Sequence, residues 1–155
     1  MKNGEMLIGE YTTSITSGKR VAIPKQLRAQ LGQGQVVLTR GYEGCVVLVS
    51  KKSFEGLLVG VSDAPFISAD KRETARFLLG GAHEMEPDGQ GRVVLPESLV
   101  AHAELTGQEV VFVGVGNWVE IWGRTRWEKY KQQLDGQASE IAGRLVNSSQ
   151  QTANS

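Results

Sequence analysis

Five basic residues in this 155-residue chain have the types and spacing that could bind nucleic acid. They are Lys19, Arg20, Lys25 and Arg28 in one short segment, and Arg92 in a second, similar segment. An arginine at a hairpin tip can pair with guanine O6 and N7, and lysine or arginine side chains can bind phosphates. Taken alone, each motif is more simply explained as a solvated turn, because such short motifs are common.

Other kinds of site have little support in the sequence. The two histidines, His83 and His102, and the single cysteine, Cys45, show no recognised zinc spacing. The sequence contains no G-x-S-x-G, Walker or Rossmann pattern. We therefore expect no metal, no cofactor and no enzymatic activity. We expect Cys45 to be a core residue, because it lies in an apolar segment.

An internal repeat places the two basic segments at equivalent positions. Aligning Arg20 with Arg92 gives an offset of 72 residues. At this offset Val21 meets Val93, Ile23 meets Leu95, Pro24 meets Pro96 and Leu27 meets Leu99. After a two-residue adjustment the match continues, with Val36-Val37-Leu38 on Val110-Val111-Phe112 and Phe54-Glu55 on Trp127-Glu128. The constant order indicates two copies of one unit.

Each copy predicts the same series of elements. A strand leads to a glycine-containing tip, and a short apolar strand and a proline-led helix over about 24–31 or 96–104 follow. Two β-branched segments and a further helix complete the unit. The predicted divisions are a first unit over 6–52, a connecting helical segment over 53–81, a second unit over 82–124, a helix over 125–146 and a disordered tail over 147–155.

The charge is distributed unevenly along the chain. The net charge is zero, which by itself argues against a nucleic-acid binder. Residues 1–80 carry 11 Lys/Arg and 7 Asp/Glu, a balance of +4, whereas residues 81–155 carry 6 and 10, a balance of −4. The first half is therefore the better candidate for phosphate contact. No apolar run is long enough to span a membrane, and no signal peptide is recognisable, so we expect a cytoplasmic protein.

Together these residues resemble a known family of regulators. The GxxGR-like tips, each followed by an apolar strand and proline, resemble the AbrB/SpoVT fold, and two copies in about 150 residues resemble the MraZ family. The second half carries the closer match, RFLLGGAHEMEPDGQGRVVLPESLVAHAEL and EVVFVGVGNWVEIWGRTRWEKY, within a resemblance running from about Met6 to Leu145. The resemblance implies an α+β, β-rich fold in which two swapped-hairpin units form a pseudo-twofold β-barrel with surrounding helices.

The same resemblance implies the function and partners. Proteins of this family regulate the division and cell-wall gene cluster, bind short direct repeats of double-stranded DNA, assemble into rings and associate with the nucleoid. The first tip departs from the family's Asp-x-Lys-Gly-Arg pattern, because it has Thr16 in place of the aspartate and the order Gly18-Lys19. The alternative is an antitoxin-like interaction protein, but two copies and a short polar tail favour the DNA-binding regulator.

The resemblance assigns a role to each basic residue. Arg20 is expected to contact bases, and Lys19, Lys25 and Arg28 are expected to contact phosphates. Two possibilities stay open for Arg92, which is either a second DNA contact or one half of an ion pair with Asp88 that fixes its tip.

Overall fold

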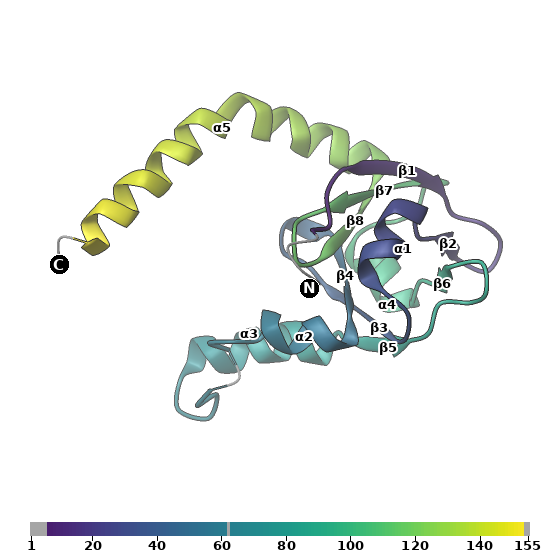
Figure 1. Ribbon diagram of the computed structural model, residues 1–155, viewed down its shortest axis with the longest axis horizontal. Coiled ribbons are helices and arrows are strands. Elements are labelled where there is room, and N and C mark those ends of the chain that lie inside the picture. The colour runs from purple at the N-terminus through teal and green to yellow at the C-terminus, as the bar shows by residue number, and fades with distance from the viewer. Residues whose placement is uncertain (1–5, 62, 154–155) are drawn as a thin grey trace. The chain divides into compact units, whose positions relative to one another are not determined.

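The computed structural model describes residues 6–61 and 63–153. The chain divides into two compact units, Met1–Arg124 and Thr125–Ser155. The strands of the first unit are β1 Glu10–Ser14, β2 Arg20–Ala22, β3 Val36–Arg40, β4 Val46–Ser50, β5 His83–Met85, β6 Arg92–Val94, β7 Glu109–Gly114 and β8 Val119–Gly123. Its helices are α1 Lys25–Leu31, η1 Tyr42–Gly44 (a 3₁₀ turn), α2 Lys51–Leu57, α3 Ala69–Gly80 and α4 Glu97–His102 (Figure 1). Helix α5, Arg124–Ala153, begins at the end of this unit and makes up the second.

The strands form an α+β fold with pseudo-twofold order. One antiparallel sheet has the order β1-β7-β8-β4-β3-β5, and a separate two-stranded ribbon pairs β2 with β6. In the repeat, β1 corresponds to β5, β2 to β6, β3 to β7 and β4 to β8. Exchanging each strand for its counterpart gives the same two strand orders, read from the other end. In the ribbon Val21 lies opposite Val93, its own counterpart, so the pseudo-twofold axis passes between these two residues. The predicted α+β class and tandem units are confirmed, whereas the pairings do not show a closed barrel.

The two repeats are interlocked through their first strands. Strand β1 pairs with β7 of the second repeat, and β5 pairs with β3 of the first repeat. Strand β2 likewise finds its ladder partner in β6 rather than within its own repeat. Each small repeat therefore completes its sheet with strands from the other, which lets both bury more apolar surface than either could bury alone.

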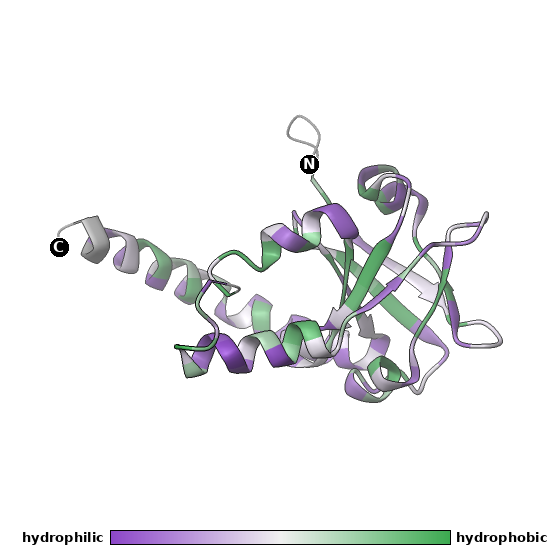
Figure 2. Ribbon diagram, turned by 90° about the horizontal axis from the view of Figure 1, so that it is seen from below, coloured by the Kyte–Doolittle hydropathy of each residue, from purple (hydrophilic) through white to green (hydrophobic). Residues whose placement is uncertain are grey.

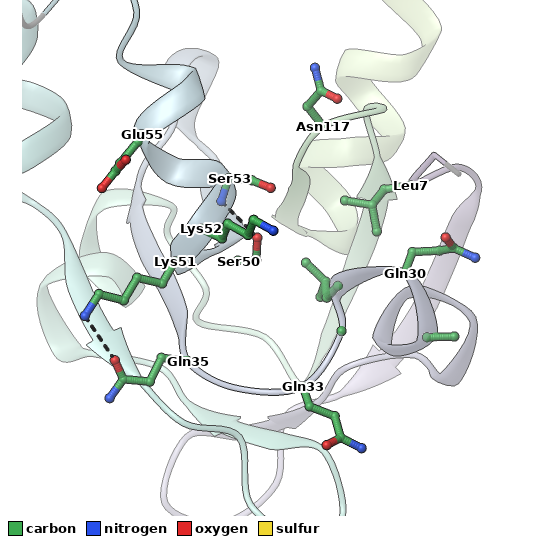
Figure 3. Close-up of a pocket in the computed structure, with 13 residues that line it drawn as sticks. Leu7, Gln30, Gln33, Gln35, Ser50, Lys51, Lys52, Ser53, Glu55 and Asn117 are labelled. Atoms are coloured by element: carbon green, nitrogen blue, oxygen red, sulfur yellow. Dashed lines mark hydrogen bonds between the residues drawn. The ribbon is translucent and has the colours of Figure 1, made fainter. Parts of the chain in front are cut away.

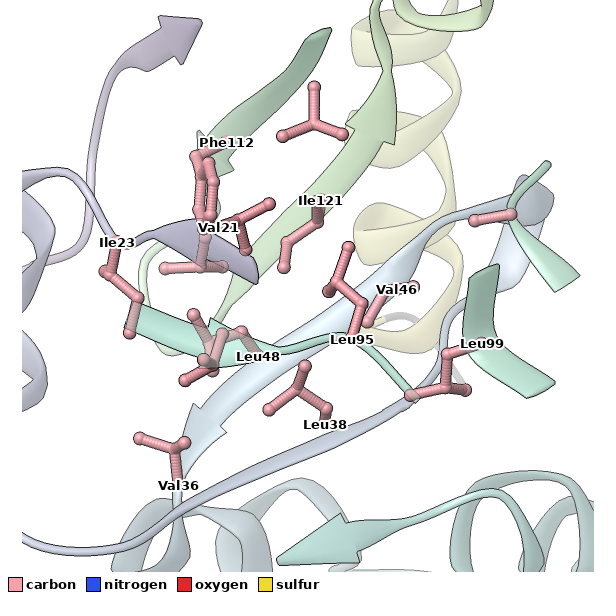
Figure 4. Packing of buried hydrophobic residues seen from close by; sticks show 14 of the residues in the cluster. Val21, Ile23, Val36, Leu38, Val46, Leu48, Leu95, Leu99, Phe112 and Ile121 are labelled. Carbon is pink, nitrogen blue, oxygen red and sulfur yellow. The ribbon is translucent and has the colours of Figure 1, made fainter. Parts of the chain in front are cut away.

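A single apolar cluster joins the ribbon to the sheet. Val21 of β2 and Leu95, the residue after β6, belong to one buried cluster with Phe112 and Ile121 of the sheet, and Val21 lies near the latter two (Figure 4). All four side chains are buried. Hydrophobic residues concentrate on the strands, whereas the loops that lead into β2 and β6 are mainly hydrophilic (Figure 2). The core thus anchors the ribbon to the sheet, while residues 16–20, which lead into β2, stay exposed to solvent.

Helix α5 differs from the expected C-terminal region. The polar tail predicted over 147–155 is helical through residue 153, and residues 154–155 lie outside the described part of the chain. The segment after Leu145 contains no glycine or proline to stop a helix that is already nucleated, so its polar residues extend the preceding turns. No helix in the described residues is long and apolar enough to cross a membrane.

Candidate nucleic-acid interface

The first tip, residues 16–20, is closed by hydrogen bonds between its ends. The backbone N–H of Thr16 donates to the carbonyl of Arg20 at 2.8 Å, and the Thr16 hydroxyl donates to the same oxygen at 3.2 Å. Two consecutive residues, Gly18 and Lys19, have positive φ angles of 78° and 59°. Lys19 thus occupies a backbone conformation that glycine adopts without strain and lysine does not.

The second tip, residues 88–92, has the same backbone closure and an added carboxylate. The Asp88 N–H donates to the Arg92 carbonyl at 2.9 Å, as in the first tip. Asp88 Oδ1 accepts the backbone N–H groups of Gln90 and Arg92, both at 2.9 Å. Asp88 Oδ2 accepts Arg92 Nε at 2.8 Å, which makes an ion pair. The backbone N–H of Arg92, more than its side chain, holds the pKa of Asp88 below its usual value.

One substitution between the repeats changes the charge that each tip presents. Thr16 stands where the second tip has Asp88, and a hydroxyl brings no negative charge to the arginine. No carboxylate within residues 6–61 and 63–153 pairs with Arg20, and its guanidinium curls over Gly18 in an exposed position. Arg92 is instead partly neutralised by Asp88. The geometry at Arg92 is that of the bracing alternative raised by the sequence.

The strand exchange decides which basic residues lie together. The Leu95 N–H donates to the Lys19 carbonyl at 2.8 Å, so the first tip adjoins the start of α4 in the second repeat. The Ile23 N–H donates to the Gly91 carbonyl at 2.9 Å, so the second tip adjoins the start of α1 in the first repeat. The predicted site is therefore divided between two ends of the ribbon. Figure 1 shows the paired strands β2 and β6 side by side.

We name these two ends by the residues that they hold. The Arg20 end carries Lys19 and Arg20. The Arg92 end carries Lys25, Arg28 and Arg92. The sequence groups Lys25 and Arg28 with Arg20 because they are close in the chain, but the fold brings them to Arg92.

Lys25 and Arg28 have different surroundings on α1. Lys25 is exposed at the first residue of the helix. The half-buried Arg28 side chain lies against Gly91 of the other repeat, and its Nε is buried without a hydrogen-bond partner in the described structure. Both residues line a cavity of about 670 Å³ between α1 and the segment 86–91, which also contributes Glu86. The cavity is thus of mixed charge, because the exposed Lys25 and the half-buried Arg28 share it with the exposed carboxylates of Glu86 and Asp88.

Two features of these tips were missed by sequence reasoning. The first is the positive φ of Lys19. The repeat alignment matches Lys19 with Gly91, and a glycine at the equivalent position is a sequence signal for positive φ. The contact of Arg28 with Gly91 had no such signal, because the two residues are 63 positions apart and meet only through the strand exchange.

A second cavity, of about 740 Å³, lies beside the C-terminal end of α1 and the start of α2 (Figure 3). Two exposed lysines line it, Lys51 and Lys52, and Lys51 pairs with Glu84 at 3.3 Å and donates to Gln35 at 3.4 Å. No group of three or more potential metal ligands occurs among the described residues. This cavity offers less unpaired charge than the Arg20 end, and we do not assign the nucleic-acid contact to it.

Comparisons with known proteins agree with the repeat. A family model described as "MraZ protein, putative antitoxin-like" matches the chain twice, over residues 6–77 and 78–148. The transcriptional regulator MraZ of Caldanaerobacter subterraneus subsp. tengcongensis is 38% identical over 142 residues, which cover 92% of this chain and 98% of that protein. The transcriptional regulator MraZ of Heliobacterium modesticaldum has the same identity and coverage. With two successive family matches and relatives aligned over nearly their full length, the chain belongs to the MraZ family.

Proposed function

We propose that this protein is a sequence-specific, DNA-binding transcriptional regulator. The observation that carries the proposal is the Arg20 end of the ribbon, where an exposed arginine, with no carboxylate partner among the described residues, lies next to an exposed lysine. A two-stranded ribbon fits the major groove of DNA, and an arginine at its tip can reach guanine O6 and N7. The names of the relatives, all transcriptional regulators, support the same function.

The proposal includes the target implied by family resemblance. The protein binds short direct repeats in the promoter of the division and cell-wall gene cluster, in the cytoplasm and at the nucleoid. At the Arg20 end, Arg20 reads bases and Lys19 contacts phosphate. At the Arg92 end, Lys25 contacts phosphate, and Arg92, held in place by its ion pair with Asp88, makes a second phosphate contact.

The proposal also includes binding as an oligomer, which the small number of available cations supports, and the family resemblance implies that this oligomer is a ring. One chain has zero net charge and presents one tip without a carboxylate partner in its described residues. Several copies held in one assembly place several Arg20 ends on adjacent repeats, and the effective concentration of each additional end strengthens binding. We expect tight binding to DNA with several repeats and weak binding to DNA with one.

The test begins with selection of DNA from a random pool by the purified full-length chain. The selected sequence and shortened versions with one repeat are then titrated with protein, and the assembly is sized by sedimentation. We expect Arg20→Ala to lose about 1–3 kcal/mol of discrimination between the selected and scrambled DNA. The matched control is Lys52→Ala, which removes an exposed cation from α2 instead.

Three results would contradict the proposal. The first would be a selection that enriches no sequence. The second would be a folded Arg20→Ala variant that binds the selected DNA as tightly as the unaltered protein. Equal affinity for one and several repeats, with a monomer in sedimentation, would reject the oligomeric part alone. An antitoxin-like interaction protein predicts the first of these results.

A further inference from the structure

We propose that Arg28 is a positioning residue, which acts across the repeat boundary to hold the second tip in its DNA-facing conformation. This inference rests on the proposed DNA-binding function but assigns Arg28 a different role from the phosphate contact expected from sequence. Its basis is the juxtaposition of the Arg28 side chain with Gly91, at the bend of the second tip.

The first step is the shape of the contact. Gly91 has a φ of 75°, and a Cβ atom built on it would meet Arg28 Cδ, Nη1 and Cζ, the last at 2.7 Å. The Arg28 side chain thus fills the volume directly above the Gly91 Cα. No alanine or larger residue fits at position 91 unless Arg28 moves away. Glycine at position 91 therefore serves two purposes: it adopts the positive φ, and it leaves room for the Arg28 side chain.

The second step is the direction in which Arg28 points. A side chain that served only to meet phosphate would keep its whole guanidinium in water until DNA arrived. Arg28 instead has its Nε buried without a hydrogen-bond partner among the described residues, an unfavourable arrangement for a polar group. Lys25, one turn earlier on α1, is exposed, as expected for a cation that meets phosphate at this end.

The third step connects Gly91 to Arg92. The Gly91 N–H donates to the Asp88 carbonyl at 2.9 Å, and its own carbonyl accepts the Ile23 N–H. The same turn lets Asp88 hold the Gln90 and Arg92 amides and the Arg92 Nε. Arg28 packs on the residue of this turn that joins Asp88 to Ile23 through backbone hydrogen bonds, so its removal should loosen the turn and release Arg92.

DNA binding distinguishes positioning from direct contact through non-additivity. The full-length protein and the variants Arg28→Met, Arg92→Ala and their double combination are titrated with the selected DNA across a salt series. If Arg28 acts through the second tip, Arg28→Met loses about as much affinity as Arg92→Ala, and the double variant loses no more than either. The salt slope then falls once, by about 0.9, rather than twice.

A direct phosphate contact predicts the opposite pattern. The fold-losses of the two single variants would multiply in the double variant, and the slope would fall by about 1.8. Arg28→Lys adds a second contrast, because lysine keeps the charge but cannot supply Nη1 and Cζ above Gly91. Nearly unchanged affinity in Arg28→Lys, or multiplied losses in the double variant, would overturn the inference.

A measurement without DNA separates this inference from the proposed function. Amide hydrogen exchange at Gln90 and Arg92, which donate to Asp88, should speed up in Arg28→Met and Arg28→Lys. Exchange at Thr16, in the equivalent place of the first tip, should stay unchanged and serves as the internal control. Unaltered exchange at Gln90 and Arg92 would overturn the positioning role. If the protein selected no DNA, faster exchange would still support the positioning role while the proposed function failed.

Discussion

Replacing Lys19 by glycine should make the protein more stable and a weaker DNA binder. Lys19 has a φ of 59°, whereas its repeat counterpart at the second tip is Gly91. The left-handed conformation costs a non-glycine residue about 1–2 kcal/mol, and this cost disappears with glycine. Glycine in turn lowers the stability by about 0.4–1 kcal/mol, because it makes the unfolded chain more flexible. The net gain is about 0.5–1 kcal/mol, which corresponds to a rise in Tm of about 1–4 °C for a chain of this size.

The same substitution removes an exposed cation from the Arg20 end. If Lys19 neutralises one phosphate per chain, the slope of log affinity against log salt should fall by about 0.9 for each Arg20 end engaged. The affinity itself should drop at low salt, where the lost charge matters most. Stability and binding should therefore move in opposite directions after a single change.

Thermal unfolding and DNA titration across a salt series measure the two effects. Lys19→Ala is the matched control, because it removes the charge but keeps a Cβ atom in the left-handed conformation. It should bind DNA as weakly as Lys19→Gly yet be about 1 kcal/mol less stable. Equal stability of the two variants would refute the strain argument, and unchanged DNA binding in both would remove Lys19 from the interface.

Three further predictions test other parts of the structure. The Cys45 thiol should resist thiol reagents in the folded protein and react on unfolding, because burial, with a smaller contribution from Glu120, raises its pKa far above the usual value; rapid modification without unfolding would contradict its placement. The pKa of Asp88 should lie below 3.8 in an NMR titration and stay depressed in Arg92→Ala, because the backbone N–H of residue 92 is the main cause. The Asp88 carboxylate stabilises the second tip above pH 3.8, and this stabilisation is lost as the pH falls through the lowered pKa. Protection of the amides at this tip from hydrogen exchange should fall over the same pH range, and Asp88→Asn should abolish that fall. Phe112→Ala should destabilise the protein by about 3–5 kcal/mol in denaturant unfolding, since the ring is fully buried between ribbon and sheet; a loss below 1 kcal/mol would show that the core is placed wrongly.

The local elements and the tandem repeat could be predicted from the residues alone. Proline and glycine mark where each short strand ends and each tip bends, and β-branched runs mark the strands, because these preferences act within a few residues. The repeat alignment that pairs Val21 with Val93 is the register found in the ribbon. The C-terminal tail was predicted less well, because polar composition indicates weak packing but not where a nucleated helix ends.

Tertiary structure alone decided which strands pair and which cations share an end of the ribbon. The alternation of apolar and polar residues in β2 is equally satisfied by a partner in its own repeat or in the other, so local sequence cannot choose between them. Burial of both repeats in one core makes that choice, pairing β2 with β6 and carrying α1 to the second tip. Arg28, eight residues from Arg20 in the chain, therefore packs on Gly91 at the other end, and the sequence could supply the basic residues without showing how they are divided.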